Sequence, residues 1–279
     1  IDRRFVAELL GFDEPSNNSL DGVSDRDFAA EFIFAASNTM VHLSRYSEEL
    51  ILFSSQDYGY ISIDEAYSTG SSIMPQKHNP DIAELVRGKT ARVLGGLTAI
   101  LTLTKGLPLA YNKDLQEDKE IFFGVYDTLT DCIKVFTGMI SSVQFNVETM
   151  LAACKTGYIN ATDVADYLVS KKGVPFRTAY EIVGALVSYA LSKKAPLDKL
   201  TLKEFNTLYI KTDAVGYQDA LKEFERLQTA GETLFDADIY SKIDIYRTLG
   251  AKASYGGPAK TAVKQSIKNL RKRLKALSN

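Results

Sequence analysis

Apolar residues recur at the spacing of an α-helix over three long stretches in the first half of the chain. The first stretch begins near residue 24 and includes Phe28, Phe32, Ala35, Ala36, Met40, Leu43, Leu50 and Phe53. The second begins near residue 80 and includes Ile82, Leu85, Val86, Val93, Leu94, Leu97, Ile100, Leu101 and Leu103. The third begins near residue 114 and includes Ile121, Phe122, Val125, Leu129, Ile133, Phe136, Ile140 and Val143. The pattern predicts three helices of about 25–30 residues, each about 40 Å long.

Residues at the ends of these stretches indicate where each helix begins or ends. We expect Ser24 to cap the first helix and Asn79 to cap the second, because both side chains accept hydrogen bonds from free backbone N–H groups. Asp114 and Glu117 have the spacing of a capping box for the third helix. Gly106 is expected to end the second helix.

The chain is predicted to be all-α, with a change of texture near residue 150. The apolar surface of each long helix is wider than one stripe, which indicates contacts on several sides and packing between bundles of different subunits. After residue 151 the helices shorten, and Gly and Pro recur. We therefore predict a central long-helix bundle domain over residues 1–150 and a smaller all-α carboxy-terminal domain over residues 151–279.

The second domain contains two predicted helices, 162–172 and 176–190, with the outline of a helix-turn-helix. Only Lys171, Lys172 and Arg177 are basic in this region, so ordinary helix packing is favoured over DNA binding. Further helices are expected over 201–209 and after Pro258. The last of these carries seven basic residues, for which a solvated face is favoured over a site for polyanions: Lys260, Lys264, Lys268, Arg271, Lys272, Arg273 and Lys275.

Composition mainly excludes classes of function. Of 279 residues, 45% are hydrophobic and 24% are charged, as in an ordinary globular protein. The net charge of −2 gives no general argument for nucleic acid, and no window approaches the ~18–20 apolar residues of a membrane span. Cys132 and Cys154 make no disulfide framework, and His42 and His78, the only histidines, exclude a histidine-rich metal site. No secretory signal is recognisable, so a cytoplasmic location with neither nucleic acid nor membrane as partner is expected.

The residues that carry chemistry gather in the segment 70–80. A serine hydroxyl is a weak base or nucleophile until a neighbouring charge or base stabilises its deprotonated form. Lys77 supplies such a charge to Ser71, and Asn79 can donate a hydrogen bond to an anion. Glu84 lies about one turn into the following helix, where it can orient Lys77. The set suits an anionic substrate that gains negative charge in the transition state.

From spacing alone, an alternative explains the same segment equally well. Gly70, Ser71 and Ser72 can be a linker, and Asn79 with the following proline can be an ordinary helix start. Of the two serines, Ser72 is the one expected to have no chemical role.

The segment 70–80 also fits a known signature. Its pattern, Gly-Ser-Ser-x-Met-Pro-x-Lys-x-Asn-Pro, resembles that of the fumarase/aspartase superfamily, whose enzymes release fumarate from succinyl-containing substrates. Neighbouring segments make the chain similar to the argininosuccinate lyase family in particular. These segments are 18–21, 24–28, 66–70, 106–108 and 111–119. The resemblance runs the whole length and is weakest between residues 200 and 254.

The resemblance implies cleavage of argininosuccinate to arginine and fumarate, for arginine biosynthesis, with no metal or organic cofactor. It implies that Ser71 acts as the catalytic serine on a mobile loop and removes the Cβ proton of the succinyl group, although its role as base or acid stays open. Lys77 and Asn79 would hold the carboxylate as it gains charge. Glu84 would orient the catalytic groups.

The resemblance further implies that Tyr111, Gln116 and Lys119 bind substrate and that Arg26 is a conformationally sensitive position. Gln116 and Lys119 are spaced to share one face of the predicted third helix. Without the resemblance, a surface salt bridge to Asp118 or Glu120 is the favoured explanation of Lys119.

The chain departs from the family pattern in one respect. Family members carry two further signatures nearer the amino terminus, including a Thr-His pair, and neither is present in a chain that starts at Ile1. The family forms a homotetramer in which three subunits build each active site. We therefore expect a carboxy-terminal portion or one chain of a split enzyme, inactive alone. Two alternatives stay open: another fumarate-releasing lyase such as adenylosuccinate lyase, or a crystallin-like structural relative without activity.

Overall fold

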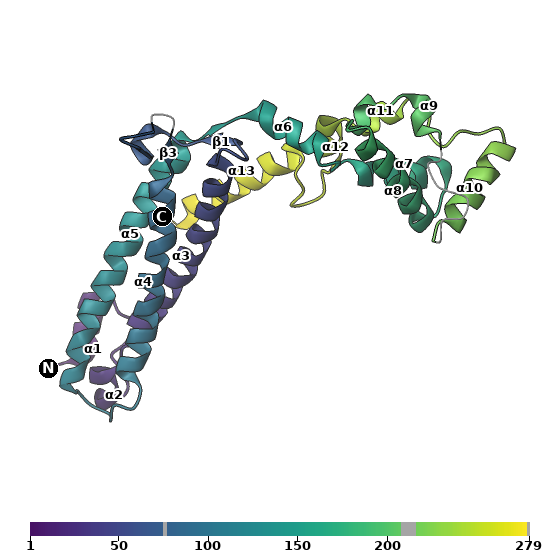
Figure 1. Cartoon of the computed structure of the whole chain (residues 1–279). Helices are drawn as coiled ribbons and strands as arrows, with labels where there is room; N and C mark the ends of the chain where they lie inside the picture. Colours follow the sequence, from purple (N-terminus) through teal and green to yellow (C-terminus); the bar gives the residue numbers. More distant parts are fainter. Residues whose placement is uncertain (75–76, 208–215, 278–279) are drawn as a thin grey trace. The chain divides into compact units, whose positions relative to one another are not determined.

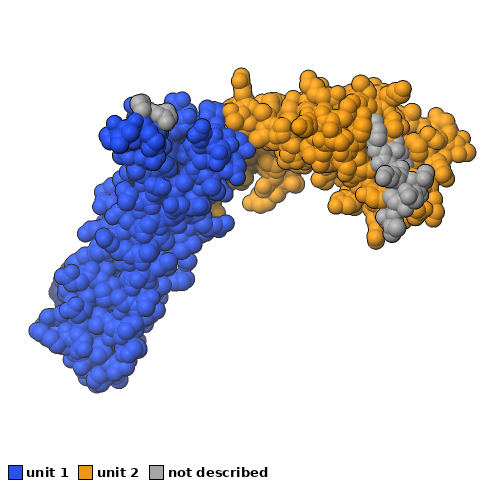
Figure 2. Space-filling model, in the orientation of Figure 1, with its two compact units in different colours: residues 1–146 blue, residues 147–279 orange. Residues whose placement is uncertain are grey.

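The computed structural model of the chain describes residues 1–74, 77–207 and 216–277. It divides into two compact units, residues 1–146 and residues 147–279, which Figure 2 colours separately. Each unit is described by itself. Both are helical, so the prediction of an all-α chain is confirmed; the strands in the described residues are each two residues long.

The first unit is built on three long helices, α3 (Asp27–Ser54), α4 (Asp81–Thr104) and α5 (Asp118–Ser142). They lie side by side as a bundle, and their lengths of 28, 24 and 25 residues confirm the predicted helices (Figure 1). The short helices α1 (Arg3–Leu10) and α2 (Ser19–Ser24) lie at one end of the bundle (Figure 1). The strands β1 (Ile61–Ser62), β2 (Thr69–Gly70), β3 (His78–Asn79) and β4 (Gln144–Phe145) lie at the other end, where β1 pairs with β4 and β2 pairs with β3, both antiparallel.

The core of this bundle is apolar and tightly closed. Ile33, Met40, Val93, Ile100 and Met139 are fully buried between the three helices. A Cβ atom on Gly96 of α4 would lie 2.5 Å from a methyl group of Val125 on α5, so only a glycine permits this approach of the two helices.

The same helices keep many large apolar side chains on the outside of the unit. The most exposed of those on α3, α4 and α5 are Phe28, Phe34, Tyr46, Leu85, Leu101 and Phe123, each more than half exposed. These side chains do not contribute to the core of the unit. Extended apolar surface of this kind marks sites of association with other proteins.

The helix ends differ from the predicted caps. Ser24 is the last residue of α2, and its hydroxyl donates to the carbonyls of Leu20 and Asp21 instead of capping α3. Asn79 lies in β3, where pairing with the preceding strand holds it extended, and Pro80 takes the cap position of α4 without a side-chain hydrogen bond.

The predicted capping box at the start of the third helix was also wrong. A 3₁₀ helix, η2 (Lys113–Glu117), includes Asp114 and precedes α5 directly. Its backbone already turns helically before α5 begins, so Glu117 makes no side-chain cap for α5.

The second unit is a cluster of shorter helices. They are α6 (Val147–Thr156), α7 (Ala161–Lys172), α8 (Phe176–Ser192), α9 (Leu202–Phe205), α10 (Gln218–Thr229), α11 (Ile239–Lys242), α12 (Ile245–Ala251) and α13 (Lys260–Leu277). Helices α7 and α8 match the pair predicted from sequence. The helix expected over 201–209 ends at Phe205, and residues 208–209 lie outside the described residues.

Leu168, Phe205, Phe235 and Ile239 form the centre of this second core, in which the Phe205 and Phe235 rings meet edge to face at 5.4 Å. Helix α13 buries none of its residues, which agrees with the expected solvated basic face. Within the described part of the chain, no helix combines the length and the apolarity that crossing a bilayer requires.

Candidate functional site

Residues 69–70 and 78–79, on either side of the segment of interest, pair at one end of the bundle. Thr69 pairs with Asn79 and Gly70 pairs with His78, so the two short strands β2 and β3 hold the base of the loop closed. Ser71 and Lys77 are the first positions beyond that paired base on either side. The sequence placed them six residues apart, and the hairpin turns this separation into proximity across the loop.

The Ser71 hydroxyl is held by the loop's own backbone. Its Oγ accepts hydrogen bonds from the N–H groups of Ile73 at 3.3 Å and Met74 at 3.2 Å. Donors directed at an oxygen stabilise negative charge on it, which lowers the free energy of deprotonating the hydroxyl. Ser71 is partly exposed, whereas its neighbour Ser72 is exposed and makes no such contact with a described residue.

The other predicted residues of this end project outward. Lys77 and Glu84 are exposed, and neither forms an ion pair with a described residue, so the expected orientation of Lys77 by Glu84 is not present in this conformation. Asn79 is half-buried and, with the adjacent His78 and Pro80, lines a cavity of about 330 Å³.

Sequence reasoning missed a carboxylate beside this cavity. Asp81 is the first residue of α4, where the positive end of the helix dipole favours an acid. Its Oδ2 atom is buried and has no hydrogen-bond partner among the described residues. The signal in the sequence was its position directly after Asn79 and Pro80 at the start of a helix.

A second group of polar residues lies at the opposite end of the bundle. Arg26 precedes α3 and donates through Nε to Oδ2 of Asp118, the first residue of α5. Lys119 donates through Nζ to Oδ1 of the same carboxylate at 2.8 Å. Asp118 is only 8% exposed. Each of its carboxylate oxygens accepts a hydrogen bond from a cationic side chain, Oδ2 from Arg26 and Oδ1 from Lys119.

The ionisation of Asp118 follows from these contacts. Burial opposes the charged form, but the hydrogen bonds from Lys119 and Arg26 outweigh it and lower the pKa of the Asp118 carboxyl below its usual value. The salt bridge between Lys119 and Asp118 was the explanation favoured for Lys119 from residues alone. Asp118 itself was missed as an organising residue of this group.

Tyr111 and Gln116 lie beside this group and are exposed. Gln116 belongs to the 3₁₀ helix η2 and Lys119 to α5, so the two residues lie on consecutive helical segments and not on one helix as predicted. His42 is exposed on α3.

The two groups are separated by the length of α4. This helix follows Asn79 and ends just before the segment that carries Tyr111 and Lys119. Its 24 residues span about 36 Å at 1.5 Å per residue. The chain therefore places Ser71, Lys77 and Asn79 at the hairpin end of the bundle and Arg26, Gln116 and Lys119 at the other end.

Comparison with known proteins shows which family the chain resembles. Residues 1–95 match the family described as "Lyase", and residues 158–249 match the family described as "Argininosuccinate lyase C-terminal". The chain is 49% identical over 277 residues to the argininosuccinate lyase of Desulforamulus reducens and 50% identical over 275 residues to that of Pelotomaculum thermopropionicum. These alignments cover 99% of the chain. The chain belongs to the argininosuccinate lyase family.

The chain spans 55% of the length of these curated relatives. Among solved structures, it resembles EDDS lyase in complex with formate, with a TM-score of 0.79 and 28% identity over 96% of this chain and 50% of that one. It also shares a fold with a class II fumarase from Schistosoma mansoni, with a TM-score of 0.58 and 19% identity over 71% of this chain and 41% of that one. The EDDS lyase and the class II fumarase thus share its helical architecture.

Proposed function

We propose that this chain takes part in cleaving argininosuccinate to arginine and fumarate. The observation that carries the proposal is the Ser71 hydroxyl, held in a hairpin loop with two backbone N–H groups directed at its oxygen. The family membership supplies the substrate, since the curated relatives are named for it.

In the proposed reaction, Ser71 acts as the general base. Its Oγ removes the proton from Cβ of the succinyl group, and the electron pair left on carbon delocalises into the neighbouring carboxylate. Lys77 and Asn79 bind that carboxylate as its charge grows, an interaction that is strongest in the transition state. The pair then forms the double bond of fumarate, while the C–N bond breaks and the guanidino nitrogen takes a proton from a general acid outside the described groups. The steps assigned to Ser71, Lys77 and Asn79 use side chains alone.

Arg26, Tyr111, Gln116 and Lys119 are proposed to bind substrate at a site of another copy. The length of α4 keeps them about 36 Å from Ser71 within one chain, beyond the reach of one small substrate. The exposed apolar surface of α3, α4 and α5 supports packing between copies, and we propose a homotetramer on this basis. Glu84 is proposed to orient Lys77 once the loop closes on substrate.

Mixing two inactive variants tests the shared site directly. The chain is first completed with the amino-terminal part of a curated relative, and Ser71→Ala and Lys119→Ala are made in separate preparations. After dissociation and reassembly together, some sites combine an intact Ser71 from one copy with an intact Lys119 from another. Fumarate release, followed by its ultraviolet absorbance, should therefore reappear in the mixture.

The control is a mixture of Ser71→Ala with Lys77→Ala, which lie in the same loop. Because every site that receives this loop from either variant lacks one of the two groups, activity should not return. Recovery in the control, or none in the first mixture although assembly occurs, contradicts a site shared in this way. Adenylosuccinate supplied in place of argininosuccinate tests the alternative lyase.

A further inference from the structure

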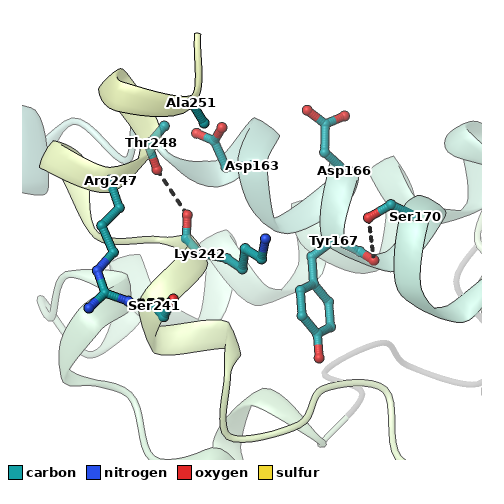
Figure 3. A pocket seen from close by; sticks show the side chains of 9 residues that line it. All are labelled: Asp163, Asp166, Tyr167, Ser170, Ser241, Lys242, Arg247, Thr248 and Ala251. Atoms are coloured by element: carbon teal, nitrogen blue, oxygen red, sulfur yellow. Dashed lines mark hydrogen bonds between the residues drawn. The ribbon is translucent and has the colours of Figure 1, made fainter. Parts of the chain in front are cut away.

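The second unit contains a cavity of about 310 Å³ between α7 and the pair α11–α12 (Figure 3). None of the residues proposed for the lyase reaction lines it. Most of its wall surface is apolar, but six lining residues bring charged or hydroxyl groups to it: Asp163, Asp166, Ser241, Lys242, Arg247 and Thr248. A cavity of this size is at the lower end of the range for small-molecule sites.

One wall of the cavity is acidic. Asp163 and Asp166 are three residues apart on α7 and therefore share a face of the helix. One oxygen of Asp163, Oδ1, lies 3.4 Å from Nζ of Lys252. The other oxygen, Oδ2, is buried and has no hydrogen-bond partner among the described residues. A buried carboxylate oxygen left without a donor is costly, so this atom needs a donor that the described chain does not supply.

The facing wall is basic. Lys242 is the last residue of α11 and Arg247 lies on α12. Figure 3 shows the Lys242 side chain extending toward Tyr167 of α7 and the Arg247 side chain extending toward Ser241. Arg247 donates through Nη1 to the Ser241 hydroxyl at 2.8 Å, which fixes one edge of the guanidinium. The Thr248 hydroxyl donates to the carbonyl of Lys242 at 2.9 Å, which ties the end of α11 to α12.

These charges do not neutralise one another. Asp166, Lys242 and Arg247 form no ion pair with any described residue, although all three line one cavity. A simple anion placed here would meet two carboxylates, and a simple cation would meet an ammonium and a guanidinium. A ligand that carries both charges satisfies both walls at once.

We propose that this cavity binds a free α-amino acid in its zwitterionic form. The α-ammonium group donates to Oδ2 of Asp163, and the carboxylate accepts from Lys242 and Arg247. Asp166 remains for a cationic side chain, which favours a basic amino acid. The volume of about 310 Å³ is within the range of sites for small ligands, as a single amino acid requires.

Calorimetric titration of the whole chain with L-arginine tests the proposal, with agmatine and succinate as matched probes. Agmatine is arginine without its carboxylate, and succinate has carboxylates without an ammonium group. L-Arginine should bind saturably, and both other probes should bind at least about tenfold more weakly, because each loses a charge-assisted interaction. Equal binding of agmatine, or no saturable binding of L-arginine, overturns the proposal.

Variants locate the binding. Arg247→Gln and Asp163→Asn should each weaken L-arginine binding about tenfold or more. Arg177→Gln on α8, whose side chain is 92% exposed, should leave it unchanged. Loss of binding in Lys119→Ala with retention in Arg247→Gln would assign the ligand to the proposed lyase site and refute this one.

A measurement on the unaltered chain covers the case in which the cavity variants do not fold. Bound L-arginine should slow acylation of Lys242 by an amine-reactive reagent, while exposed Lys222 on α10 reacts at its usual rate. Peptide mass spectrometry reads both sites in one digest. Equal labelling of Lys242 with and without saturating L-arginine contradicts the proposal.

Discussion

The two ends of the bundle in residues 1–146 hold their polar groups in different ways. At the hairpin end, Lys77 and Glu84 are exposed, and Ser71 is held only by its own loop. At the other end, Arg26 and Lys119 are both fixed on the buried carboxylate of Asp118. The polar groups at the first end have few contacts with described residues, whereas those at the second end are fixed by a buried carboxylate. Changes at the hairpin should therefore affect catalysis and hardly change the free energy of unfolding. Changes at Asp118 should mainly lower the free energy of unfolding.

The largest effect is expected from Ser71→Ala in the completed lyase. Loss of a general base lowers kcat by about 10²–10⁴, with little change in KM, because the group acts mainly in the transition state. The free energy of unfolding should hardly change, since the side chain bonds only to its own exposed loop. Steady-state kinetics and urea unfolding measure the two quantities.

Ser72→Ala is the matched control, because it removes the same hydroxyl from the next, exposed position. It should retain kcat close to that of the unaltered enzyme. A Ser71→Ala variant that keeps most of its kcat would remove this residue from catalysis.

Asp118→Ala is expected to give the largest loss of stability. It leaves the Arg26 guanidinium, now partly buried, without its carboxylate, and removing one partner of a buried pair costs about 3 kcal/mol or more. Urea unfolding of the chain measures the change. Asp114→Ala, on the exposed surface of η2, should stay within about 0.5 kcal/mol. Equal losses of unfolding free energy in the two variants would show that the contacts of Asp118 with Arg26 and Lys119 do not stabilise the chain.

Lys119→Ala should raise KM about tenfold or more and change kcat less. Its ammonium is exposed while its charge is oriented by Asp118, as suits a group that grips a substrate carboxylate. The Lys119→Arg variant keeps the charge and should recover part of the affinity. A variant with lowered kcat and unchanged KM would count against a binding role.

The smallest effect is a pH dependence of stability carried by Asp118. Its pKa is lower in the folded chain than in the unfolded chain, so the unfolded state takes up the proton first as pH falls. The stabilisation is complete above the ordinary carboxyl pKa of about 3.9 and is lost as pH falls through the folded value below it. The difference in urea midpoint between the unaltered chain and Asp118→Asn should shrink over this acidic range. A difference that stays constant there would contradict the assigned ionisation.

The long helices could be predicted because their signal is local and repeated. Many apolar positions at one spacing determine α3, α4 and α5, and no one contact changes that pattern. Helix ends depend on fewer atoms and on partners far along the chain. Asn79 has the chemistry of a cap, yet its pairing with Thr69 in a hairpin takes precedence. Ser24 ends one helix and does not begin the next, because a preceding short helix takes its hydroxyl.

The candidate site could be predicted where its residues are close in the sequence. It was missed where folding brings together residues that are far apart in the sequence. Ser71, Lys77 and Asn79 lie within nine residues, so their association could be read from the sequence. Asp118 acts through Arg26, 92 residues away, and nothing at either position alone indicates that contact. Asp81 escaped notice for a related reason, since burial of one carboxylate oxygen becomes visible only after folding.

The length of helix α4 sets the distance between the two polar groups in any assembly in which the two ends of the bundle serve different sites. Each copy delivers a serine loop at one end and a cationic pair at the other, at a separation fixed by 24 residues. Deleting one helical turn would shorten that separation by about 5.4 Å in every copy. Each site would then receive its groups from copies whose α4 helices are all shortened, so the groups would no longer meet at their original positions. The length of this helix should therefore tolerate insertions and deletions far less than its exposed surface tolerates substitutions.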